Sequence, residues 1–180
     1  MSDSKFLYVH PQDLNEYVCF WKDFLKTTID FLKSRGICQY KDLRKKSARA
    51  AIEPALWKIS ETNGKYHIRY YSKETWERTL KEGRLPSRAT GSWNSPRAEL
   101  MFEHVVERAP LIEWMLEDPS NIDIIEDVCI GCIVTKSESK LLPNRCGVDP
   151  KNVWARYLEK KIDVYDRMLD KWHILDGKLV

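Results

Sequence analysis

Residues 128–135, VCIGCIVT, decide the class of fold, because they form an uncharged apolar run that is rich in β-branched side chains. A run of this kind is typical of a strand buried on both faces of a sheet. Residues 65–71 alternate well enough between the two faces to predict a second strand. Residues 162–165 and 172–175 are expected to pair as a terminal hairpin. The chain is therefore predicted to contain a small sheet.

Several stretches of the chain are expected to be helical. In residues 13–35, apolar side chains recur at spacings of three and four, which is the period of an amphipathic helix. Most of the others are bounded by capping residues, prolines or glycine. They are residues 41–59, 72–83, 97–109, 111–116, 121–127, 136–142 and 149–158. Pro54 is expected to interrupt or restart the second of these helices, because proline has no backbone N–H to donate.

These elements predict an α+β fold in which several helices pack on a small sheet. The length suits a single domain, residues 1–180, with an N-terminal helical part at 12–60 and an α+β part at 64–180. The sequence has no run of about 18 apolar residues that could cross a membrane. The five cysteines are an odd number and the N-terminus does not resemble a signal peptide, so we expect a cytoplasmic protein with free thiols.

Charge is divided unevenly along the chain, although the net charge is only +3. Residues 33–97 contain sixteen Lys and Arg against six Asp and Glu, whereas residues 98–127 contain nine acidic residues and one basic residue. Because cations bind phosphates, the basic segment favours a nucleic-acid partner. The candidate phosphate contacts are Arg44, Lys45, Arg49 and Arg88. Alternatively, the acidic segment neutralises the basic one within the fold, and no basic surface results.

A second candidate site lies on the helix expected at residues 97–109. Glu99 and Glu103 are four residues apart and would share one face of that helix, where two carboxylates could hold a divalent metal. His104 could then act as a general base and activate a water molecule. The alternative interpretation is a solvated acidic face with a histidine at its edge.

The cysteines offer a third candidate, a zinc site. Cys129 and Cys132 are three residues apart and Cys146 follows, so thiolates could supply most of a tetrahedral set, with His173 or Cys38 as the fourth ligand. In a regular strand, however, Cys129 and Cys132 would point to opposite faces. The alternative is that these thiols are part of the apolar core.

Three short segments resemble small bacterial and phage proteins of the HNH, or His-Me finger, type. They are FEHVV at 102–106, CIVTKSES at 132–139 and VWARY at 153–157. The resemblance implies that His104 is the general base, that Glu103 is its acidic neighbour, and that a divalent metal such as Mg²⁺ or Zn²⁺ assists cleavage of nucleic acid. Ser139 stands where such proteins carry a metal-binding histidine, so Glu138 or His173 would have to replace that ligand.

The leading hypothesis is therefore a nucleic-acid-handling protein, either a degenerate HNH-like nuclease or a DNA-binding protein. The alternative is a non-enzymatic inhibitor or adaptor that binds a protein through its charge-divided surface. Other enzyme classes find no motif in the sequence, which lacks a phosphate-binding P-loop, a dinucleotide-binding glycine motif and a nucleophile elbow.

Overall fold

The computed structural model describes residues 14–37, 46–61, 68–86, 99–144 and 147–180. The N-terminal half of the described chain contains α1 (Leu14–Ser34), α2 (Lys46–Ser60), β1 (Tyr70–Ser72), α3 (Lys73–Glu82) and β2 (Leu100–His104). The C-terminal half contains α5 (Arg108–Glu117), the 3₁₀ helix η3 (Pro119–Ile124), α6 (Ile125–Val128), β3 (Gly131–Thr135), α7 (Lys136–Leu141), α8 (Ala155–Glu159), β4 (Val164–Asp166), β5 (Lys171–Leu175) and β6 (Lys178–Leu179). Helices and one sheet are combined, so the predicted α+β class is confirmed.

Among the described residues, the sheet has six strands in the order β2-β3-β1-β4-β5-β6. Only β1 and β3 pair in parallel, and every other neighbouring pair is antiparallel. Strand β3 lies between β2 and β1, and all of its residues are buried, as the apolar run at 128–135 predicts. The run begins differently from the prediction, however, because α6 extends to Val128 and the strand starts only at Gly131. The predicted terminal hairpin is confirmed by the pairing of β4 with β5.

The prediction of a helix at residues 97–109 is wrong. Residues 100–104 form strand β2, which pairs antiparallel with β3, and helix α5 begins only at Arg108. Leu100, Phe102 and His104 are buried, whereas the two residues between them are less so. This alternation has the period of two that a strand requires, and pairing with the buried β3 overrides the helical pattern.

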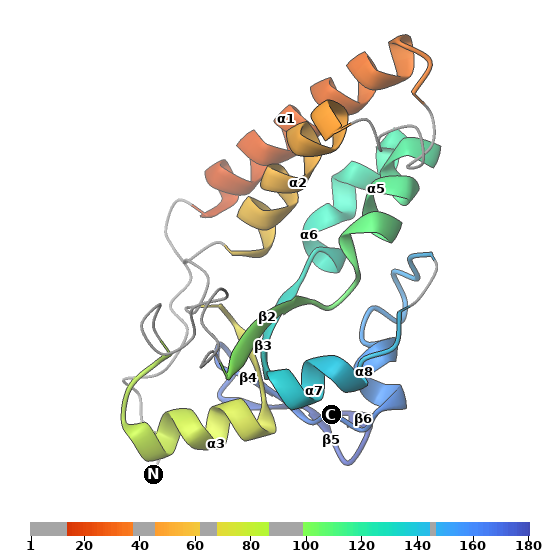
Figure 1. Cartoon of the computed structure of the whole chain (residues 1–180). Coiled ribbons are helices and arrows are strands. Elements are labelled where there is room, and N and C mark those ends of the chain that lie inside the picture. Colours follow the sequence, from red (N-terminus) through yellow and green to blue (C-terminus); the bar gives the residue numbers. More distant parts are fainter. Residues whose placement is uncertain (1–13, 38–45, 62–67, 87–98, 145–146) are drawn as a thin grey trace.

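Figure 1 shows the fold as two parts, with α1, α2, α5 and α6 together above and the sheet with α3, α7 and α8 below. The upper part has its own apolar core, which includes Leu25, Leu56 and Met115. The sheet is covered on both faces, because Cys132 and Val134 of β3 pack in one cluster and Ile133 packs in another. None of the described helices is both long enough and apolar enough to cross a bilayer.

Local sequence signals set several helix ends. The Ser72 side chain accepts a hydrogen bond from the Thr75 N–H and begins α3, and Gly83 ends this helix in the left-handed conformation, as predicted. Helix α7 begins with a capping box. Pro54 was expected to interrupt α2, but the helix runs through it without a break. The neighbouring Ala55 and Leu56 are fully buried, and this packing compensates for the hydrogen bond that proline cannot make.

Candidate functional site

Glu103 and His104, the predicted catalytic pair, lie next to each other on β2. Successive side chains of a strand point to opposite faces of the sheet, so the two groups do not converge. His104 follows Phe102 on the face covered by Trp57, whereas Glu103 follows Met101 on the face covered by α7 and α8. The structure therefore does not bring the predicted acid and base into one site.

His104 is sealed in an aromatic environment. Its ring meets the ring of Trp57 edge to face at 4.7 Å, and its Nε2 lies 3.2 Å from the Ser60 hydroxyl. Ser60 Oγ in turn donates to the carbonyl of Leu56 at 2.9 Å. Burial, and to a smaller extent the positive charge of Arg108, lower the pKa of His104 from 6.5 to about 3. A histidine with so low a pKa is a poor general base near neutral pH.

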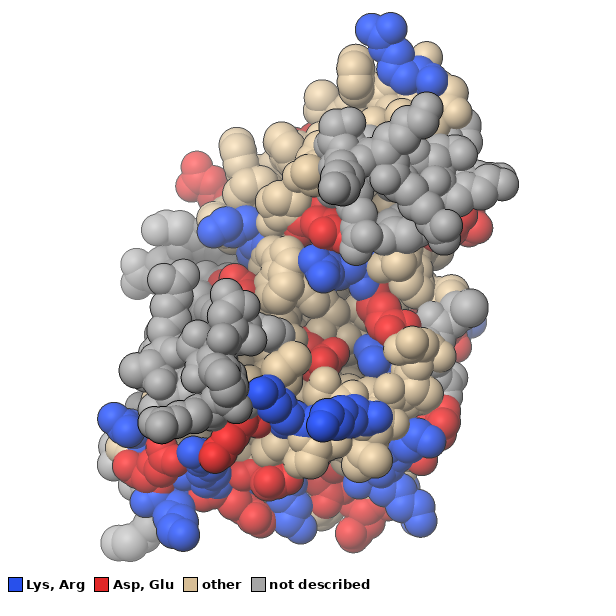
Figure 2. Space-filling view, viewed as in Figure 1, with Lys and Arg blue, Asp and Glu red and all other residues tan. Residues whose placement is uncertain are grey.

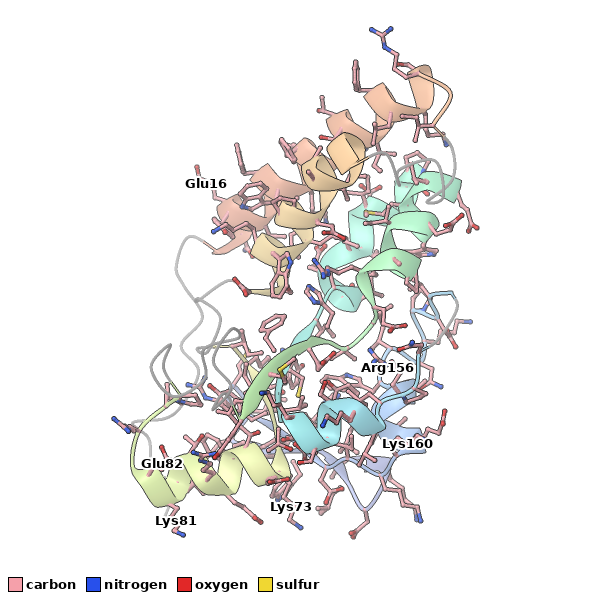
Figure 3. All side chains as sticks on the ribbon, viewed as in Figure 1. Glu16, Lys73, Lys81, Glu82, Arg156 and Lys160 are labelled. Carbon is pink, nitrogen blue, oxygen red and sulfur yellow. The ribbon has the colours of Figure 1, made fainter. Side chains whose placement is uncertain are left out.

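Glu103 instead contacts helix α7. Ser139 Oγ donates to Glu103 Oε1 at 2.6 Å, so the serine that replaces the expected histidine does meet the carboxylate. Burial raises the pKa of Glu103, while the hydrogen bond from Ser139 and the charge of Arg156 oppose the rise. Arg156 of α8 donates to the backbone carbonyl of His104 at 3.2 Å and fastens this end of β2 (Figure 3).

The residues around Glu103 do not fit a bound divalent metal. Its contact is a hydroxyl donor rather than a second carboxylate or an imidazole. The substitute ligands are also elsewhere, since Glu138 accepts the Ser72 hydroxyl and His173 belongs to β5. Across the described ranges, no three His, Cys, Asp or Glu side chains are grouped as a metal site requires.

The described part of the predicted cysteine site is not assembled either. Cys129 follows the last turn of α6 and donates to the carbonyl of Leu56 at 3.3 Å, whereas Cys132 lies on β3. Both thiols are buried in the apolar clusters, and burial raises the pKa of Cys129 to about 12. Cys38 and Cys146 lie outside the described residues. A buried neutral thiol is typical of a core residue.

Most of the predicted phosphate contacts lie outside the described residues. Arg44, Lys45 and Arg88 are not described, and Arg49 lies in the first turn of α2 with a side chain that is not described. Several other bases of residues 33–97 pair with carboxylates: Arg69 with Asp166, Lys73 with Asp163, Arg84 with Glu82, and Arg78 with Glu82 and Glu99. Figure 2 accordingly shows blue and red atoms interspersed on this face of the molecule.

A cleft of about 670 Å³ lies where the helical part meets the sheet. Helix α1, the end of α2 and α6 line it from one part, and β1, β5 and residues 151–154 line it from the other. This volume is within the range of about 300–1,000 Å³ that is typical of small-ligand sites. The residues that line the cleft come from distant parts of the sequence, so no local sequence pattern predicts it.

One wall of the cleft is a cluster of three aromatic rings. The ring centroid of Trp154 lies 4.9 Å from the ring centroids of both Tyr70 and His173. The ring centroids of Tyr70 and His173 are 5.2 Å apart. The Arg69 guanidinium lies 4.9 Å from the centre of the Tyr70 ring. Its Nε and Nη2 atoms both donate hydrogen bonds to the buried Asp166 carboxylate. Arg69 is thereby held in one position beside the aromatic wall.

His173 has an unsatisfied polar atom in this wall. Its Nε2 is buried and has no hydrogen-bond partner in the described part of the protein. Burial lowers the pKa of His173, so the ring is neutral near pH 7, and Nε2 can donate or accept one hydrogen bond according to the tautomer. Buried polar atoms are nearly always satisfied in proteins, and this one belongs to a residue that lines the cleft.

Charged groups lie on the other sides of the cleft. Lys22 of α1 pairs with Glu126 at 2.9 Å, and Lys151 is exposed beside Asn152. The lining thus combines an aromatic wall, cations, the carboxylates of Glu126 and Asp127 and the ring nitrogen of His173. Comparison with known proteins adds no assignment: no family model matches the chain, and no curated protein or solved structure is significantly similar to it.

Proposed function

We propose that this protein binds single-stranded nucleic acid without cleaving it, and that the cleft receives one unpaired nucleotide. The observation that carries the proposal is the wall formed by Tyr70, Trp154 and His173, in which the buried Nε2 of His173 has no hydrogen-bond partner among the described residues. A nucleobase offers both a flat apolar face and hydrogen-bonding edges. Tyr70 and Trp154 are largely buried, so the base would pack against the accessible edge of this wall.

Cations near the wall support a phosphate-bearing ligand. Arg69 has a side chain that is 34% exposed and a guanidinium already oriented by Asp166. Lys151 is exposed on the same cleft. Arginine and lysine bind phosphate oxygens through charge-assisted hydrogen bonds, so a nucleotide phosphate is expected at this rim.

Loss of nuclease chemistry is the second half of the proposal. β2, β3 and α7 carry the segments that resemble HNH proteins, but His104 is sealed against Trp57 and Glu103 is bonded to Ser139. We therefore infer a protein of HNH-like type that binds nucleic acid and does not hydrolyse it. The free thiols of Cys129 and Cys132 support a cytoplasmic location, which is reducing.

Fluorescence anisotropy with a labelled single-stranded oligothymidylate tests the binding. We expect the full chain to bind the oligonucleotide, with an affinity that falls as salt rises because phosphate contacts release counterions. Lys151→Glu should weaken binding and lower the slope of log K against log salt by roughly one to two units, since one cation is replaced by an acid. His173→Phe keeps the ring, removes the ring nitrogens and should weaken binding several-fold.

Lys81→Glu is the matched control, because Lys81 is an exposed lysine on α3 and does not line the cleft (Figure 3). This control should bind as the unchanged protein does. Equal losses in Lys151→Glu and Lys81→Glu would contradict a site in the cleft. Failure of the unchanged protein to bind at low salt would contradict the proposal as a whole, and cleavage of the oligonucleotide with Mg²⁺ or Mn²⁺ would contradict its second half.

A further inference from the structure

The outer side of α1 carries a row of exposed aromatic side chains. Taking 3.6 residues per turn, Phe20, Phe24 and Phe31 lie on one side of the helix, opposite the buried Leu25 and Ile29. Phe20 is 60% exposed, Phe24 is 39% exposed and Phe31 is 58% exposed. Isolated exposed apolar residues are common, but three phenylalanines on one helix face form a patch that indicates an interaction.

The spacing of this row is that of a coiled-coil seam. Successive members are three and four residues apart, which matches the a and d positions of a heptad repeat. The a and d positions of this seam are held by the three phenylalanines together with Tyr17 and the polar Thr27. The ring of Trp21 packs against Phe20 and Phe24. The distances between ring centroids are 5.1 Å to Phe20 and 5.6 Å to Phe24. A second helix could therefore pack along α1.

Acidic residues follow one flank of the seam at intervals of seven. Glu16, Asp23 and Asp30 are all exposed and each precedes an a position, so they occupy the g positions that pair with a partner helix in coiled coils. Figure 3 shows Glu16 at the outer side of α1, away from the sheet. The three g positions from Glu16 to Asp30 are thus all acidic.

We propose that α1 docks a helix of another protein that has apolar residues at a and d and lysine or arginine beside them. A second copy of this chain fits less well. An antiparallel copy would place its own Glu16, Asp23 and Asp30 against the acidic flank, and a parallel copy would offer a single cation, Arg35. The negative flank also disfavours an anionic lipid surface. This surface does not include the cleft residues, so the inference is independent of nucleotide binding.

Two synthetic helices of four heptads test the surface by isothermal titration calorimetry. Both have leucine at a and d, and one has lysine and the other glutamate at e and g. The full chain should bind the lysine peptide about tenfold more tightly than the glutamate peptide at low salt, because three charge pairs act together. The triple variant Glu16→Lys/Asp23→Lys/Asp30→Lys should reverse this preference.

Phe20→Ser/Phe31→Ser tests the apolar seam and should weaken the lysine peptide by about tenfold or more. Leu141→Ser/Leu169→Ser is the matched control, because these leucines are as exposed but lie on other elements. Circular dichroism confirms that each variant is folded. Equal binding of both peptides, an unchanged preference in the triple variant, or a dimer in light scattering that Phe20→Ser/Phe31→Ser abolishes would overturn the proposal.

Discussion

Acidification should unfold the protein through His104, because this side chain is buried in its neutral form. The unfolded chain binds a proton at His104 with a pKa near 6.5, whereas the folded chain does so only near pH 3. The stabilisation is therefore complete above pH 6.5 and is lost progressively as the pH falls from there to about 3. Each pH unit within this window removes about 1.4 kcal/mol of unfolding free energy.

At about pH 5 the protein should have lost about 2 kcal/mol through His104 alone, since this pH lies about one and a half units below the unfolded pKa. Urea unfolding at about pH 7.5 and pH 5 measures the loss. Two variants remove the titration while preserving part of the site: His104→Phe keeps a ring against Trp57, and His104→Gln keeps a hydrogen-bonding group near Ser60.

Both variants should be less stable than the unchanged protein at about pH 7.5, and both should lose about 2 kcal/mol less on acidification. Other titrating groups, such as Glu103 and His173, contribute equally to all three proteins and cancel in the comparison. If the three proteins lose the same free energy between the two pH values, His104 exchanges protons freely in the fold. That result would refute its sealed environment and restore it as a candidate base.

Three further changes test the packing that positions the cleft, each by urea unfolding. Gly131→Ala would place a methyl group 2.3 Å from the Phe102 ring and should cost about 1–3 kcal/mol, whereas a shift below a few tenths would show that the ring moves freely. Arg69→Met leaves the fully buried Asp166 carboxylate without its guanidinium partner and should cost about 3–5 kcal/mol; a neutral effect would mean that backbone N–H groups suffice. Thr135→Ala removes the capping box of α7 and should cost about 1 kcal/mol, with no loss expected for Thr135→Ser.

Elements with strong local signals were predictable. The apolar period of α1, the Ser72 and Gly83 ends of α3, and the buried β3 all follow from neighbouring residues. Residues 100–104 show the opposite case. The motif LMFEH suits a helix or a strand by propensity, and only its ladder with β3 selects the strand. That error changed the predicted site, because Glu103 and His104 became residues on opposite faces of a sheet.

The binding properties proposed for this chain depend on different ranges of sequence. The seam of α1 and its acidic flank are local, since a helix brings residues three, four and seven apart onto one side. The cleft is not local, because Arg69, Trp154 and His173 come from separate segments and meet only after β1, β4 and β5 pair.

Secondary-structure type and the amphipathic face of α1 were thus encoded in short-range patterns, where backbone geometry sets the period. Strand pairing, the sealing of His104 and the meeting of the three rings required the tertiary structure. Burial sets the pKa and the contacts of these groups, and burial depends on residues that are distant along the chain.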